Sequence, residues 1–276
     1  DGAFKDAGHI KTITIPSNIN AVGNSAFENS GIESANIDKL CKFIGDRAFY
    51  NCQSLRVVNF SEDQGDLRFI GNCAFANTKL GSDENGNPGV IPFKVPKSNN
   101  LVIGSGAFYN CTYLGNVDFS NTNSTISLGC YAFAGDYNLT NVDLKNVGTI
   151  KNHATSADNP QCGIFSQCGN LSEVTFDNTF SDKLPYGTFA DCPNLYYVKF
   201  KNGNATFHTI ENSSTTPHTY ESDFKGLNNN FHMWGNGADD SLHRLCTKAS
   251  ITYRYYLDPP DDKNFEYFDK YGYKYS

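Results

Sequence analysis

The sequence lacks any run of eighteen apolar residues, the length that a membrane-spanning helix requires. It also lacks a charged segment followed by an apolar one at its start, the pattern of an export signal. Basic side chains are outnumbered, with 22 Lys and Arg against 29 Asp and Glu and a net charge of −7. This balance argues against nucleic acid as a partner, because neutralising phosphates needs a basic surface.

An internal repeat organises most of the chain. Its clearest word is Ala-Phe with a glycine three residues before the alanine. Gaps of 22 to 26 residues between the phenylalanines set one unit near 23 residues, and gaps up to 35 residues are one unit plus an insertion. Complete copies end at Phe27, Phe49, Phe75, Phe108 and Phe133, and partial copies at Phe4, Phe165, Phe189 and Phe224.

A second word, apolar-x-x-apolar-x-apolar, follows each phenylalanine by five or six residues. Its alternating last three positions, often β-branched, predict a short strand. In the fourth unit we expect the word at Val90/Phe93/Val95, behind the insertion GSDENGNPG. The other copies begin at Ile10, Ile32, Leu55, Leu114, Leu139, Leu171 and Leu195.

Stacking explains why such a unit repeats. One unit cannot bury its apolar side chains alone, but neighbours on both sides bury them in a continuous core. Each buried phenylalanine contributes roughly 1.5–3 kcal/mol, and glycine permits a tight turn or a close backbone approach. We therefore expect a β-rich solenoid of about nine coils over residues 1–235. Its first coil is expected to be truncated, because Asp1-Gly2-Ala3-Phe4 matches the middle of a unit.

The nine cysteines fall into two groups. One group recurs between the two words, in "NC" or a relative. A residue that recurs in this way indicates a buried structural thiol, because a catalytic cysteine needs a partner base in one coil only. The recurring cysteines are Cys52, Cys111, Cys168 and Cys192, while Cys41, Cys73, Cys130, Cys162 and Cys246 lie outside this register and leave open whether a disulfide forms among them.

The segment IGDRAFYNCQSLRVVNF, residues 44–60, resembles the BspA-like branch of leucine-rich repeats. The consensus covers residues 1 to about 200 and, more loosely, to about 234. The resemblance implies a right-handed superhelix with a parallel sheet on its concave face and short strands, turns or 3₁₀ segments on its convex side. It also implies a secreted or cell-surface protein, associated with adhesion and without catalytic residues. The seventh coil departs from the consensus, because TSADNPQCGIF lacks the usual strand before the phenylalanine.

The concave sheet is the first candidate binding surface. Side chains alternate along a strand, so the third and fifth positions of the second word should face outward. Stacked Asp118 and Asp143 should repel modestly, which favours a cationic or polyhydroxyl partner. The alternative is an ordinary solvated face. The predicted binding residues are Asn116, Asp118, Asn141, Asp143, Glu173, Thr175, Tyr197 and Lys199.

Two other regions are candidates for recognition. Insertions at residues 81–89, 145–161 and 201–222 are rich in Asn, Ser, Thr, Gly and Asp, as many binding loops are. After about residue 235 the repeat stops, and we expect residues 236–276 to form a cap, with a helix over 239–249 and a strand in SITYRYYL. The alternative there is a binding surface built from the seven tyrosines of the last 24 residues.

No coil combines a unique nucleophile with a base, so we expect no enzymatic activity. We expect neither metal nor cofactor: Asp83-x-Asn85-x-Asn87 begins like a calcium loop, but Pro88 stands where glycine is required. The leading hypothesis is a monomeric adhesion module that binds a host matrix protein, a host cell-surface protein or a bacterial partner. The alternatives are a glycan- or mucin-binding surface protein and a rigid spacer within a larger one.

Overall fold

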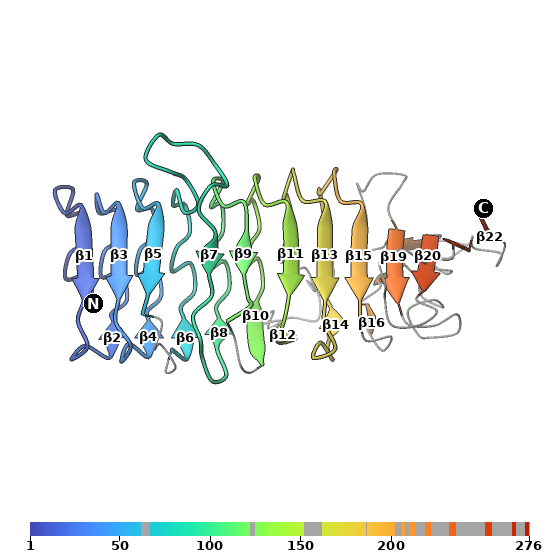
Figure 1. Cartoon of the computed structure of the whole chain (residues 1–276), viewed down its shortest axis with the longest axis horizontal. Coiled ribbons are helices and arrows are strands. Elements are labelled where there is room, and N and C mark those ends of the chain that lie inside the picture. Colours follow the sequence, from blue (N-terminus) through green and yellow to red (C-terminus); the bar gives the residue numbers. More distant parts are fainter. Residues whose placement is uncertain are drawn as a thin grey trace.

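The structure, a computed structural model, describes residues 1–61, 67–121, 125–151, 162–185 and 187–201, and beyond residue 201 the backbone of seven short strands. The chain forms a parallel β-solenoid whose coils follow one another along a single long axis (Figure 1). None of the described residues forms a helix. The expected leucine-rich-repeat solenoid with a parallel sheet is therefore confirmed.

Two layers of strands run the length of the solenoid. The first layer contains the strands that the second word predicts, and in its central coils Val142 and Leu144 point inward while Asn141 and Asp143 are exposed. It comprises three hydrogen-bonded groups: β1 (Thr12–Ile15), β3 (Ser34–Ile37) and β5 (Val57–Phe60); β7 (Phe93–Lys94) and β9 (Val117–Asp118); and β11 (Asn141–Leu144), β13 (Glu173–Phe176), β15 (Tyr197–Phe200), β19 (His232–Gly235) and β20 (Thr252–Tyr255).

The second layer lies just before each Ala-Phe word. In the seventh coil the strand is displaced rather than missing: β12 pairs in parallel with β10, but residues 152–161 separate it from Phe165. The layer comprises β2 (Ala21–Val22), β4 (Phe43–Ile44), β6 (Phe69–Ile70), β8 (Val102–Ile103), β10 (Ile126–Gly129) and β12 (Val147–Lys151), and then the pair β14 (Lys183–Leu184) and β16 (Thr206–Phe207).

Beyond residue 201, β20 lies in the segment predicted as a cap, where SITYRYYL predicts a strand, and it pairs in parallel with β19. Two antiparallel hairpins also occur, β17 (Ile210–Asn212) with β18 (Thr219–Glu221) and β21 (Tyr267–Phe268) with β22 (Lys274–Tyr275). The predicted helix over 239–249 and the ninth coil at Phe224 lie outside the described residues. The boundary between solenoid and cap stays a prediction.

The core is organised around one stack of phenylalanine rings. Successive rings lie 5.1 to 5.9 Å apart between centroids, with planes within 17° of parallel. This separation is close to the spacing of paired strands, about 4.8 Å. The 33-residue unit between Phe75 and Phe108 keeps 5.5 Å, so its insertion leaves the stack unbroken. The stack contains Phe4, Phe27, Phe49, Phe75, Phe108, Phe133, Phe165 and Phe189.

The turn around the stacked phenylalanine contains a left-handed residue on each side of the ring in every coil of the stack except that of Phe165, where only Gln167 is left-handed. In the third coil Arg47 and Asn51 have φ of 56° and 57°, and the same two positions are left-handed in the neighbouring coils. Asparagine tolerates this conformation better than most residues, which explains why it precedes the cysteine. The glycine before each Ala-Phe serves a close approach: a side chain at Gly71 would collide with the backbone of Gly45 and Asp46.

The prediction for the fourth coil is wrong in one position. Phe93 and Val95 are buried as expected, but Val90 is 55% exposed. Leu80, which directly precedes the insertion, is buried at the position of the word's first residue. The insertion therefore enters within the word rather than before it. Near this point the first layer is interrupted between β5 and β7, where a cavity of about 950 Å³ is lined in part by Asn59, Pro92 and Lys97.

Removing one ring tests the stack. Phe108→Ala should lower the free energy of unfolding by about 3–5 kcal/mol, because it leaves a cavity between fully buried neighbours. The adjacent Tyr109, 42% exposed, is the control, and Tyr109→Ala should change stability by no more than about 0.5 kcal/mol. Urea denaturation followed by circular dichroism measures both. Equal effects of the two substitutions would contradict the stack.

Candidate functional site

The outer face of the first layer holds the predicted binding residues where the alternation placed them. Asn116, Asn141 and Asp143 are exposed. The registers of β11, β13 and β15 align Asn141, Glu173 and Tyr197 in one row. They align Asp143, Thr175 and Lys199 in a second row, while Asn116 and Asp118 lie on or beside β9 in the neighbouring group of strands. The other five predicted residues are half-buried: Asp118, Glu173, Thr175, Tyr197 and Lys199.

Asp118 has a cationic neighbour on one side. The register of β7 and β9 pairs it with Lys94. Its carboxylate also accepts a hydrogen bond from the Ser120 amide at 2.8 Å. β9 and β11 belong to different hydrogen-bonded groups of strands. No strand pairing therefore aligns Asp118 with Asp143 in the way that the sequence predicts. Repulsion between these carboxylates is therefore a weaker argument for a cationic partner than the sequence suggested.

Polar contacts organise the face around β13 and β15. The Lys199 ammonium lies 2.7 Å from Oε1 of Glu173. The same ammonium is 5.6 Å from the centroid of the Tyr197 ring. The ring of Tyr196, 36% exposed, meets Tyr197 edge-on with centroids 4.4 Å apart. Two tyrosines and an ion pair thus form a fixed cluster, which we call the β15 cluster (Glu173, Tyr196, Tyr197 and Lys199). The strand alternation did not predict Tyr196 as a binding residue, because Tyr196 directly precedes β15. The two adjacent tyrosines in the sequence could have indicated it.

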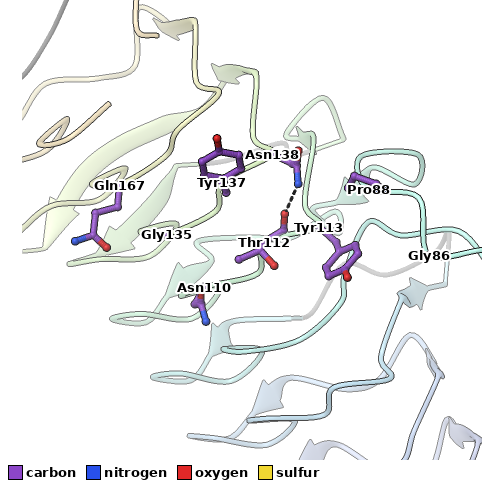
Figure 2. A pocket seen from close by; sticks show the side chains of 9 residues that line it. All are labelled: Gly86, Pro88, Asn110, Thr112, Tyr113, Gly135, Tyr137, Asn138 and Gln167. Carbon is purple, nitrogen blue, oxygen red and sulfur yellow. Dashed lines mark hydrogen bonds between the residues drawn. The ribbon is translucent and has the colours of Figure 1, made fainter. Parts of the chain in front are cut away.

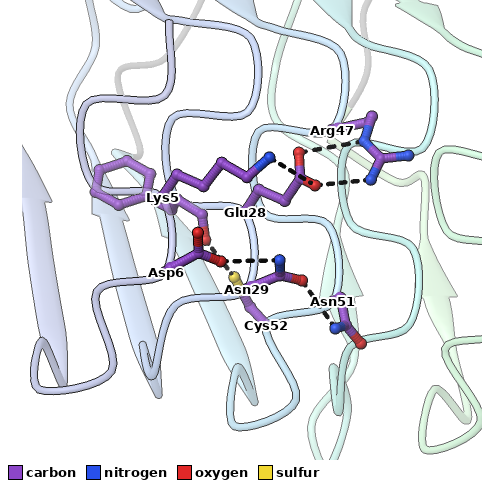
Figure 3. Close-up of polar contacts among 8 residues, drawn as sticks. Lys5, Asp6, Glu28, Asn29, Arg47, Asn51 and Cys52 are labelled. Atoms are coloured by element: carbon purple, nitrogen blue, oxygen red, sulfur yellow. Dashed lines mark hydrogen bonds and ion pairs between the residues drawn. The ribbon is translucent and has the colours of Figure 1, made fainter.

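An ion pair on another edge links the first three coils (Figure 3). The Arg47 guanidinium donates to both carboxylate oxygens of Glu28, at 2.7 and 3.2 Å, and the Lys5 ammonium lies 3.4 Å away. The hydrogen bonds from Arg47 are the main reason that the pKa of Glu28 falls to about 2. Both cations that reach this carboxylate come from adjacent coils, Lys5 from the first and Arg47 from the third, so the ion pairs hold three successive coils together.

The recurring cysteines form the expected ladder of buried thiols. Each thiol donates to the carbonyl oxygen of the phenylalanine in an earlier coil: Cys52 to Phe27 at 2.9 Å (Figure 3), and Cys111 to Phe75 at 3.1 Å. Cys168 and Cys192 repeat the contact. Burial raises the pKa of the Cys52, Cys111 and Cys168 thiols. A high pKa suppresses the thiolate, so these groups are poor nucleophiles.

An acid occupies the ladder position in the sixth coil. Asp136 is fully buried between the coils of Cys111 and Cys168. Its Oδ1 accepts the Cys111 amide at 2.7 Å, and among the described residues its Oδ2 has no hydrogen-bond partner. Burial raises the pKa of Asp136 well above its ordinary value of 3.8. The geometry offers no substrate access, so this acid is a structural substitution in the ladder rather than an active site.

One disulfide joins two cysteines outside the ladder register, Cys130 and Cys162. They lie at equivalent positions, each three residues before its stacked phenylalanine, and 32 residues apart in sequence. The bond therefore holds the sixth coil to the seventh across residues 152–161. Cys41 and Cys73 form no disulfide within the described part of the chain, and Cys246 lies outside the described residues.

The described residues contain no group of three or more His, Cys, Asp or Glu side chains arranged to hold a metal ion. The carboxylate of Asp83, in the sequence that resembles a calcium loop, accepts hydrogen bonds from Asn85 and Asn87 at 2.7 to 2.9 Å. Within the described part of the chain there is also no helix with the length and apolar character needed to cross a membrane.

These features define a leucine-rich-repeat solenoid whose described polar clusters mainly join coils. The model of one protein family, the BspA type leucine rich repeat region, matches the chain in six copies, over residues 1–84 and 90–214. The match covers more than half of the chain, so the chain belongs to this family. A comparison with curated protein sequences gives no match.

Three solved structures are similar at low identity. A leucine-rich repeat protein from Bacteroides ovatus shares 19% identity at a TM-score of 0.45, over 88% of this chain and 60% of that one. A leucine rich cell surface protein from Faecalibacterium prausnitzii shares 16% sequence identity at a TM-score of 0.35, over 82% of each chain. The pneumococcal vaccine antigen PcpA shares 16% sequence identity at a TM-score of 0.39, over 91% of this chain and 80% of that one. This chain thus spans about 60% of the Bacteroides ovatus chain.

Alkylation tests the assignment of the cysteines. In denaturant without reductant, iodoacetamide should label Cys52, Cys111, Cys168 and Cys192 but neither Cys130 nor Cys162, and mass spectrometry of the peptides reads this out. Reduction should free both and lower the free energy of unfolding by about 3–4 kcal/mol, since a 32-residue loop is released. Labelling of Cys130 before reduction would contradict the disulfide.

Asp136→Asn tests the buried acid. The folded state holds the Asp136 proton more tightly than the unfolded chain does, because the pKa is raised on folding. The contribution of Asp136 to the free energy of unfolding is therefore greatest below its pKa in the unfolded chain. This contribution falls as the pH rises toward its pKa in the folded protein. Denaturation at several pH values should show that the asparagine variant gains stability relative to the parent between about pH 4 and pH 7. Identical pH profiles would show that Asp136 is not buried as a neutral acid.

Proposed function

We propose that the chain is a non-catalytic, extracellular protein-binding module, and that its partner contacts the outer face of the first layer around β11, β13 and β15. The observation that carries the proposal is the β15 cluster. Tyrosine provides large contact area at low entropic cost, and aromatic side chains dominate binding energy at protein interfaces. The partner class we propose is a host matrix or cell-surface protein, or a protein on another bacterium.

The rigidity of the face supports this proposal. Parallel registers hold its rows of side chains, and the Glu173–Lys199 ion pair orients the aromatic cluster before a partner arrives. Such a surface loses little conformational entropy on binding. Leucine-rich repeats of this family generally mediate protein interactions. The exposed Asp143 and the net charge of −7 favour a basic patch on the partner.

An extracellular location is supported by the disulfide. Disulfides between structural elements form and persist outside the reducing cytosol. The Cys130–Cys162 bond joins two coils of the core, where it has a structural role. A secreted or surface-exposed solenoid is therefore the setting that we propose for the binding face.

A matched pair of double variants tests the face. Purified protein is passed over immobilised matrix proteins in surface plasmon resonance. Asp143→Ala with Tyr197→Ala should weaken any binding at least tenfold, about 1.4 kcal/mol, because a central aromatic anchor and an exposed charge are lost.

The control removes one charge and one tyrosine elsewhere. Arg68→Ala with Tyr131→Ala alters two exposed residues outside the first-layer strands, and it should bind as the parent does. Thermal melting verifies that both variants are folded. The proposal fails if the parent binds none of the proteins, or if the two variants lose affinity equally.

A further inference from the structure

An open groove of about 620 Å³ crosses the fifth, sixth and seventh coils (Figure 2). None of its lining residues belongs to a first-layer strand, so it is distinct from the proposed protein-binding face. Asn110, Thr112 and Tyr113 come from the fifth coil, Tyr137 and Asn138 from the sixth, and Gln167 from the seventh. At strand spacing these coils extend over about 10 Å, long enough for a ligand of more than one small unit.

The groove is uncharged. None of the residues that line it carries an ionisable acid or base other than tyrosine, although the chain as a whole has a net charge of −7. Its rim is formed by Gly86 and Pro88, in the loop that Asp83 closes through hydrogen bonds to Asn85 and Asn87. An ionic ligand would lose hydration there without meeting a counter-charge among the lining residues. A neutral ligand has no such cost.

Two tyrosine rings are held in place at the groove. In Figure 2 they lie on either side of Thr112 and Asn138. Tyr137 is 56% exposed, yet its ring packs directly on Gly169, where any larger residue would collide with it. The Tyr113 ring has the Lys79 ammonium 5.5 Å from its centroid. A supported aromatic ring that remains open to solvent is suited to stacking against a flat, partly apolar surface.

Neutral hydrogen-bonding groups surround these rings. The Asn138 amide donates to the Thr112 carbonyl at 2.7 Å, which fixes its orientation. Asn110 donates through Nδ2 to Asn77 at 2.8 Å, so its own carbonyl oxygen is available as an acceptor. Within the described part of the chain the exposed Gln167 side chain makes no hydrogen bond, so both its donor and its acceptor are available to a ligand.

We propose that this groove binds a neutral carbohydrate chain. A sugar ring presents an apolar C–H face, which the Tyr137 ring can cover, and hydroxyl groups at its rim, which the amides of Asn110 and Gln167 can pair. Binding of this kind is independent of the protein-binding face, since the two surfaces share no residue. The same chain can therefore hold a glycan and a protein together.

The test is a glycan array that contains neutral, sialylated and sulfated oligosaccharides, followed by calorimetry with the neutral oligosaccharides that bind. The parent should bind neutral glycans, and Tyr137→Ala should weaken that binding at least tenfold, because the stacking ring is lost. Tyr137→Phe keeps the ring and should stay within about threefold of the parent. Tyr109→Ala, an exposed tyrosine outside the groove, is the matched control and should leave affinity unchanged.

Three results would overturn the proposal. In the first, the parent binds no neutral glycan, or it binds only charged ones. In the second, Tyr137→Ala binds neutral glycans as well as Tyr109→Ala does, although melting curves show that both are folded. In the third, the groove takes an unglycosylated peptide in a manner that depends on Tyr137 and excludes the neutral sugars.

Discussion

The described coils are stacked through hydrogen-bonded parallel strands, so the side chains and turns of successive coils must fit the strand spacing of about 4.8 Å. The phenylalanine rings meet this requirement with centroids 5.1 to 5.9 Å apart, within the range of offset-stacked aromatic pairs. Amide-to-carbonyl bonds between coils, such as that from Phe49 to Ala74 at 2.7 Å, impose the same spacing on the turns. The insertion after Leu80 leaves this spacing intact, because the rings of Phe75 and Phe108 on its two sides still lie 5.5 Å apart.

The strands and their faces could be predicted because alternation is a local property of the chain. The second word placed Val142 and Leu144 inside and Asp143 outside, as the structure has them. The recurring cysteines were also predictable, since recurrence itself indicates a structural position. Val90 was misplaced because an apolar residue at the right spacing resembles the word even when Leu80 already fills the position. Asp136 escaped notice because a single acid in a turn resembles a solvated residue until its neighbours are known.

The candidate sites differ in how far the sequence could reveal them. The first-layer face follows from side-chain alternation, so its residues were predicted by number, while the β15 cluster depends on which side chains meet across strands. The groove has no linear pattern. Its residues come from three coils and from the rim that Asp83 closes, and Gly169 contributes by having no side chain where Tyr137 lies. Only the packing of successive coils brings these residues together.

The disulfide has a mechanical consequence when the chain is stretched from its ends. When a repeat array is pulled from its ends, coils peel away one after another and each releases its contour length. The segment from Cys130 to Cys162, a sequence separation of 32 residues, is withheld from this extension, which shortens the fully stretched chain by about 110 Å at roughly 3.4 Å per residue. The covalent link carries load past the segment at residues 152–161, and it keeps the sixth and seventh coils, on which Tyr137 and Gln167 lie, joined under tension.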